Sequence, residues 1–400
     1  MLRNSPLIAA ILLALASATG AHADPAATAP RSGPILDARL RYESVSDDAF
    51  ANSADATTLR FRLGYRTPVK SGWSGLIAIE NNSHLLGEHF NSSANGQTHF
   101  PTVADPDNTA LDQAFVQYAP SAATRFTLGR QLILYDNQRF FGNSGWRQNE
   151  QTFDALDMEH HFGNGLALRY SYLDRVQRVF GEDNPNPTLA RFMLDAHLLR
   201  ASFPVGPGTL VGYAHFIDNH TLPLTSHRNL GLRYSAKHDQ KDGVGWLANL
   251  EYATQHSYAN GSHLINADYT LVEGGLTWRG NTFKAGWEQL GGDGHYGFQT
   301  PFATLHAFDG WADRFLTTPV NGLRDGYLSW NRGFGKLSAT VALHDFRSDH
   351  ASIHYGREWD ASLGWAFAPH WNALAKFADY HAGDIGFDVA KTWLSVEYSY

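Results

Sequence analysis

Basic, acidic and aromatic side chains are concentrated in residues 129–157, GRQLILYDNQRFFGNSGWRQNEQTFDALD. The stretch contains Arg130, Arg139, Arg147 and Asp154. A guanidinium group binds a carboxylate through paired hydrogen bonds, and aromatic faces offer stacking surfaces to sugar rings. This composition predicts recognition of an acidic sugar, with an ordinary solvent-exposed loop as the alternative interpretation.

A second set of arginines occupies alternate positions in two segments, as Arg39 and Arg41 and as Arg60 and Arg62. Alternate side chains of a strand face the same side, so we expect a local cationic wall that favours anions. Arg169 and Arg233 are expected on the same inward side of later strands. The competing interpretation is mutual compensation by acidic residues on the inward faces, namely Asp37, Glu43, Glu80, Asp157, Glu159, Glu251, Glu273, Glu288, Asp360 and Glu397.

Residues suited to catalysis or metal binding lack the spacing that such sites need. Ser338 and His344 share one face of a predicted strand but are six residues apart, about 20 Å in an extended chain. The adjacent His160 and His161 would point to opposite faces and could not chelate one ion. We therefore expect no catalytic residues, no cofactor and no metal ligands.

The elements that must position these arginines are β-strands. In residues 37–43 a polar set alternates with Ala38, Leu40 and Tyr42, and residues 59–66 repeat the pattern. Such alternation predicts strands with one face toward lipid and the other toward water. We predict eighteen strands of about 9 to 11 residues. Their expected centres lie near residues 40, 62, 77, 115, 128, 156, 169, 198, 211, 232, 249, 272, 285, 328, 341, 363, 375 and 394.

The connections between these strands alternate in length. Those after even-numbered strands are short and rich in turn residues, whereas residues 83–109, 133–151, 176–191 and 291–322 form long connections after odd-numbered strands. This asymmetry is typical of the periplasmic turns and extracellular loops of an outer-membrane barrel. The fold prediction is an all-β, transmembrane, antiparallel up-and-down barrel of 18 strands with both termini in the periplasm.

The N-terminus predicts export. Arg3, an apolar run from Leu7 to Ala18 and the sequence Ala21-His22-Ala23 are typical of a cleaved signal peptide, residues 1–23. A short lead, residues 24–34, would precede the barrel of residues 35–400. The absence of cysteine argues against a small disulfide-bonded secreted domain, and the net charge of −8 argues against nucleic acid as a partner.

Two long segments resemble the alginate export family of outer-membrane proteins. The first is the stretch of residues 129–157, and the second is residues 301–327, PFATLHAFDGWADRFLTTPVNGLRDGY. The resemblance implies an 18-stranded barrel whose electropositive constriction conducts acidic polysaccharide without energy coupling. It further implies functional roles for Arg130, Arg139, Arg147 and Asp154 in the first motif and for His306, Asp313, Arg314 and Asp325 in the second.

We therefore expect a passive outer-membrane channel for anionic saccharides, serving alginate-type polysaccharide export or the passage of acidic oligosaccharides. The alternative is a general or catabolic porin for small organic anions or other small solutes. Expected partners are outer-membrane lipid and lipopolysaccharide, the acidic saccharide itself and the barrel-assembly machinery, with the chain a monomer. A soluble sandwich or propeller, a receptor with an N-terminal plug and an adhesin fit the sequence less well.

Overall fold

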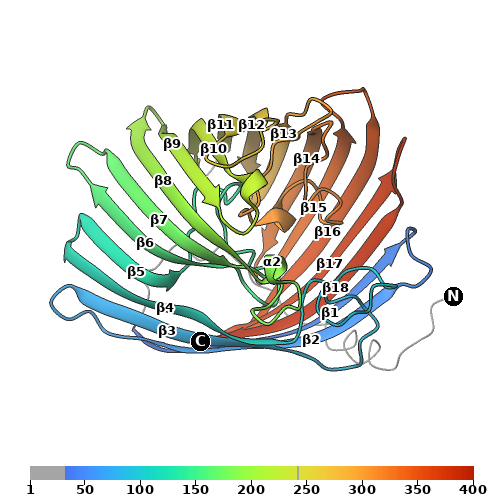
Figure 1. The fold of residues 1–400 in the computed structure, drawn as a ribbon, viewed down its shortest axis with the longest axis horizontal. Helices are drawn as coiled ribbons and strands as arrows, with labels where there is room; N and C mark the ends of the chain where they lie inside the picture. Colours follow the sequence, from blue (N-terminus) through green and yellow to red (C-terminus); the bar gives the residue numbers. More distant parts are fainter. Residues whose placement is uncertain (1–31, 241–242) are drawn as a thin grey trace.

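The computed structural model describes residues 32–240 and 243–400, so the predicted signal peptide and most of the predicted lead lie outside the described residues. Eighteen antiparallel strands form one closed sheet, because β1 pairs with both β2 and β18. Figure 1 shows them ringing a central space. The strands are β1 Gly33–Asp47, β2 Ala54–Arg66, β3 Trp73–His84, β4 Asn108–Ser121, β5 Thr124–Gln131, β6 Thr152–His161, β7 Ala167–Gln177, β8 Arg191–Val205, β9 Gly208–Asn219, β10 His227–His238, β11 Val244–Ser257, β12 Asn266–Trp278, β13 Asn281–Leu290, β14 Leu323–Phe334, β15 Leu337–Arg347, β16 His354–Ala368, β17 Trp371–Ala382 and β18 Val389–Ser399.

The predicted fold is confirmed, and each expected strand centre lies inside one strand. Lengths differ from the expectation, since the strands run from 8 residues in β5 to 15 in β1. A tilted strand needs only about 9 to 11 residues to cross the hydrocarbon layer, so the longer ones extend beyond it. Three short helices occur in loops of the described part of the chain, α2 (Pro187–Ala190), η2 (Pro223–Thr225) and η3 (Leu305–Ala307). Among the described residues, no helix is long and apolar enough to cross a membrane.

Side-chain alternation sets the two faces of the wall. Phe61, Leu63 and Tyr65 of β2 are 43 to 49% exposed on the outer face, whereas Arg60, which precedes Phe61, is 3% exposed. Side chains that are buried in this barrel therefore point into the lumen, because only the outer face meets lipid.

The tight turn between β12 and β13 is determined by its own two residues. Arg279 (φ 49°) and Gly280 (φ 79°) form this two-residue link. Two successive positive φ values match the twist of a tight hairpin, and glycine adopts the second without strain.

Two long loops fold into the lumen and pack against each other. We name the loops by order along the chain: L2 is residues 85–107, L3 is 132–151, L7 is 291–322 and L9 is 383–388. The backbone N–H of Gly142 in L3 donates to the carbonyl oxygen of Phe302 in L7 at 2.9 Å, and the N–H of Thr304 donates to the carbonyl of Gln138 at 3.0 Å. L3 and L7 therefore act as one inward-folded unit.

The lumen is filled unevenly by this unit. Phe140 and Phe141 of L3 pack with Phe298 and Phe302 of L7, and this apolar cluster reaches Tyr269 of β12. Through Phe153, Tyr213 and Tyr269 the cluster contacts the wall at β6, β9 and β12. Open space remains on the opposite side, against β1, β17 and β18.

Candidate functional site: a constriction between two cavities

Asp313 of L7 lies at the centre of a cluster of basic groups. Its carboxylate accepts hydrogen bonds from Arg147 at 3.0 Å, from Lys391 at 2.9 Å and from Nδ1 of His306 at 2.7 Å. Burial by itself would raise the pKa of this carboxyl, but His306, Lys391 and Arg147 outweigh burial and hold the pKa of Asp313 well below its ordinary value. Asp313 is therefore ionised and joins L3, L7 and β18.

His306 connects Asp313 to strand β17 of the barrel wall. Its Nε2 atom lies 2.7 Å from Nζ of Lys376 on β17. Because an ammonium group can only donate, Nε2 must accept and Nδ1 carries the proton that bonds Asp313. Burial, together with nearby Lys376, lowers the pKa of His306 well below its usual range despite the opposing effect of Asp313. The imidazole is therefore neutral with a fixed tautomer.

Trp146 of L3 completes the cluster through stacking contacts. Its ring lies parallel to that of His306, with 4.4 Å between the ring centroids and an interplanar angle of 8°. The guanidinium of Arg41 and the ammonium of Lys376 each lie 4.2 Å from the Trp146 ring centroid. Lys376 is 3.6 Å from the ring of Trp311 as well. Cations over aromatic faces are stabilised by the ring quadrupole, most strongly when water is excluded.

Two cavities adjoin this cluster. The inner cavity, of about 500 Å³, is on the periplasmic side and is lined by Arg39, Arg41, Trp311, Lys376 and Glu397. The outer cavity, of about 350 Å³, is on the extracellular side and is lined by Asp47, Phe50, Arg314 and Lys391 among others. Trp146 and His306 line both cavities and thus form the wall between them. We call Trp146, Arg147, His306 and Asp313 the constriction.

Of the predicted strand arginines, Arg39 and Arg41 reach this site. Arg39 donates to the carbonyl of Gly145 at 3.1 Å and to the side chain of Gln148 at 2.8 Å, and it has no ion pair with a carboxylate among the described residues. Arg41 is 3.8 Å from Asp105 of L2. Arg39 therefore faces the inner cavity without an ion-pair partner among the described residues, whereas the charge of Arg41 is partly compensated by Asp105.

Arg60 and Arg62 of β2 are neutralised by neighbours. Arg60 pairs with Asp37 and Glu397. Arg62 meets three carboxylates, those of Glu80, Asp112 at 3.0 Å and Glu150 at 3.3 Å. These two residues fit the competing interpretation of mutually compensated charges.

Several predicted residues lie in the lumen wall away from both cavities. Arg130 pairs with Asp154 at 2.7 Å, Arg169 pairs with Asp157 at 2.8 Å, and Arg233 pairs with Glu251. Asp325 is 2.8 Å from His344. Each pair joins strands next to each other in the sheet, which fits a structural role in holding the wall.

The predicted loop residues mainly anchor L3 and L7. Arg139 is 1% exposed and bridges Glu288 of β13 at 2.9 Å and Asp309 of L7 at 2.8 Å. Burial alone would lower the pKa of Arg139. The neighbouring carboxylates of Asp309 and Glu288 have the larger opposite effect and raise this pKa above its ordinary value, so the guanidinium stays charged. Arg147 pairs with Glu43 of β1 at 3.4 Å as well as with Asp313. Arg314 lies 3.4 Å from Asp47 and borders the outer cavity.

Sequence reasoning missed Lys376, Lys391 and Trp311. The alternation of β17 and β18 places both lysines on the inward face, so the same pattern that predicts the inward arginines could have found them. Trp311 lies within the second motif, although nothing in the sequence says that it meets Lys376.

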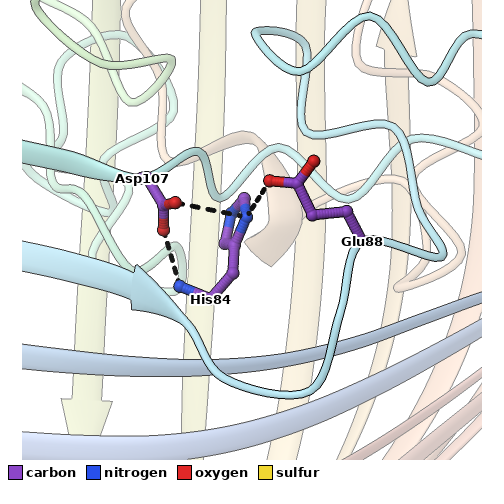
Figure 2. Close-up of side chains that lie close together, drawn as sticks. All are labelled: His84, Glu88 and Asp107. Atoms are coloured by element: carbon purple, nitrogen blue, oxygen red, sulfur yellow. Dashed lines mark hydrogen bonds and ion pairs between the residues drawn. The ribbon is translucent and has the colours of Figure 1, made fainter.

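A group of potential metal ligands lies apart from both cavities. His84 ends β3, Glu88 is in L2 and Asp107 immediately precedes β4, and Figure 2 shows the three side chains pointing toward one another. Their ligand atoms all lie within 4.8 Å of one another. The expectation of no metal ligands stays a prediction, and the proximity of these three groups is a finding of the tertiary structure.

Comparisons with known proteins agree with the barrel fold and with the resemblance to the alginate export family. Residues 36–170 match the family model described as alginate export, which confirms the resemblance over that part of the chain. No curated protein matches the chain significantly.

Solved structures of similar fold include OccK9 (OpdG) of Pseudomonas aeruginosa, at 15% identity and a TM-score of 0.74, and OccAB2 of Acinetobacter baumannii, at 15% and 0.71. The outer membrane protein OpdK of Pseudomonas aeruginosa gives 16% and 0.68. Each comparison covers 92% of this chain and 98% of the other. The chain is an outer-membrane β-barrel channel.

Proposed function

We propose that this channel conducts carboxylate-bearing saccharides by passive diffusion, either as acidic oligosaccharides or as an alginate-type polymer. The observation that carries the proposal is the lining of the inner cavity, where Arg39, Arg41 and Lys376 stand beside Trp146 and Trp311. Three cations face one carboxylate, that of Glu397, which is itself engaged by Arg60. The family match over residues 36–170 supports the same solute class.

The chemistry of such a solute fits this lining. A uronate ring carries one carboxylate, which the cationic groups would attract, and a face of C–H groups, which would pack on an indole ring. A volume of about 500 Å³ is within the range of about 300 to 1,000 Å³ typical of small-molecule sites. The inner cavity would thus hold a short saccharide, and a longer chain would need L3 and L7 to separate at the constriction.

The test is selectivity and block in planar lipid bilayers. We expect the wild-type channel to prefer anions and to be blocked by short oligouronates more strongly than by neutral oligosaccharides of equal length. Lys376→Gln and Arg39→Gln should each shift the reversal potential toward cation preference and weaken the block several-fold. Arg125→Gln is the matched control, because Arg125 is about half exposed and lies outside both cavities. An unchanged block in both cavity variants would refute the assignment.

A second candidate function is passage of small organic anions. The aromatic lining and the closed wall at the constriction would suit a single planar carboxylate, and OpdK, a protein of similar fold, has been solved with vanillate. Block by an aromatic carboxylate, with no effect of oligouronates, would favour this candidate over the first.

A further inference from the structure

At the mouth of the barrel, both ring nitrogens of His84 face hydrogen-bond acceptors. Nε2 of its imidazole lies 2.9 Å from the backbone oxygen of Asp105, and a carbonyl oxygen only accepts. Nε2 must therefore carry a proton. Nδ1 then faces the carboxylates of Glu88, at 3.0 Å, and Asp107, at 3.6 Å, which are acceptors as well (Figure 2).

The His84 side chain is only 6% exposed, whereas the carboxylates of Glu88 and Asp107 are 40% and 60% exposed. A lone pair and two anionic oxygens at these distances require a positive charge among them. That charge is either a second proton on the ring or a bound metal ion. The spacing of the three atoms fits a bound metal ion.

We propose that His84, Glu88 and Asp107 bind one divalent transition-metal ion of the Zn²⁺ class at the extracellular mouth. In a tetrahedral site with metal–ligand distances of about 2.0 to 2.1 Å, ligand atoms are separated by about 3.3 Å. The observed separations from Nδ1, 3.0 and 3.6 Å, lie on either side of this value. Imidazole nitrogen with carboxylate oxygen suits Zn²⁺ and its neighbours, whereas Ca²⁺ and Mg²⁺ prefer oxygen-only sites.

Two further contacts preorganise the group. The Asp105 carbonyl fixes the tautomer and orientation of the ring, which is the role of outer-shell partners at metal-binding histidines. Asp107 accepts a hydrogen bond from the backbone N–H of His84 at 2.6 Å, which holds its carboxylate beside the ring. Protein ligands at three positions would leave the fourth to water.

The bound ion would act on the lumen through Asp105. The carboxylate of Asp105 accepts from the backbone N–H of Gln148 in L3 at 2.7 Å and lies 3.8 Å from Arg41 and 3.9 Å from Arg147. Fixing L2 at both ends would therefore stabilise the position of L3 at the constriction. This inference concerns the metal alone and is independent of which solute the channel passes.

The experiment is a Zn²⁺ titration of the full-length barrel, purified without a histidine tag, stripped with chelator and kept in detergent micelles. Calorimetry should give about one Zn²⁺ per chain at the highest-affinity site, with an affinity reduced at least about tenfold in His84→Asn and in Glu88→Gln. His99→Asn, in the same loop and exposed, is the matched control and should leave that affinity unchanged. Heat-dependent gel mobility verifies folding of each variant, and Glu88→Gln changes only an exposed side chain.

Equal Zn²⁺ affinity in all four proteins would overturn the proposal, as would the absence of Zn²⁺ binding by the folded wild type. In the latter case His84 carries a second proton and forms a simple ion pair. Stronger binding of Ca²⁺ than of Zn²⁺ would overturn the assigned metal class.

Discussion

Nζ of Lys376 on β17 lies 2.7 Å from Nε2 of His306 in L7, so the barrel wall holds the inward-folded loop through one lysine–histidine hydrogen bond. The opposite ring nitrogen bonds Asp313, which in turn binds Arg147 of L3 and Lys391 of β18. A single imidazole thus connects two strands and both loops at the constriction.

Replacing Asp313 by Asn should loosen this connection. The substitution removes the charge shared by Arg147 and Lys391 and leaves buried cations without their partner, a loss of about 3 to 5 kcal/mol for a buried pair. We expect a lower thermal midpoint and frequent flickering of single-channel current. A variant with wild-type midpoint and steady current would show that Asp313 does not hold the loops.

Acid should weaken the constriction in two stages. His306 has a folded pKa below 6.5, so its contribution to stability is full above about pH 6.5 and declines as the pH falls toward its folded pKa. Asp313 has a folded pKa below 3.8, so its contribution is full above about pH 3.8 and is lost only as the pH falls through that lower value. Single-channel recordings from pH 7.5 to 4.5 should therefore show increasing conductance below about pH 6.5.

The control for this pH dependence is His306→Gln, whose side chain does not titrate. We expect its conductance to stay nearly constant between pH 6.5 and 4.5. A wild-type slope preserved in this variant would assign the effect to other groups.

Arg62→Gln should affect stability more than selectivity. The variant would leave the carboxylates of Glu80, Asp112 and Glu150 together without their shared cation, again a loss of about 3 to 5 kcal/mol. Its charge is already compensated and it borders neither cavity, so the reversal potential should change little. Arg125→Gln, which breaks an exposed pair with Glu159, should cost only about 0 to 1 kcal/mol. A large shift in reversal potential for Arg62→Gln would place this residue in the permeation path.

Deleting residues 291–322 should raise single-channel conductance several-fold, because L7 supplies His306 and Asp313 to the constriction and Phe298 and Phe302 to the apolar filling. The deletion should also lower the thermal midpoint, because Phe140 and Phe141 of L3 lose the aromatic side chains of L7 that they pack against. Deletion of residues 384–387 in the exposed loop L9 is the matched control and should leave conductance unchanged. Equal conductance in both deletions would mean that L7 does not limit the pore.

The sequence by itself determined the strands, the two faces of the wall and the inward position of the arginines. Arg60 and Arg62 alternate with Phe61 and Leu63, and a strand turns successive side chains to opposite sides whatever its neighbours are. This rule is local, so eighteen strands could be read without knowing how they pair. The positive-φ turn at Gly280 is local for the same reason.

Only the tertiary structure decided which charges stay uncompensated and where the pore narrows. Arg39 and Arg60 are indistinguishable by pattern, yet Arg60 meets two carboxylates and Arg39 contacts the backbone of L3. The meeting of Lys376 with His306, and of His84 with Asp107, depends on strand order and on the inward folding of loops. Ion pairing acts over a few ångströms in space between residues up to hundreds of positions apart, and no local periodicity encodes that proximity.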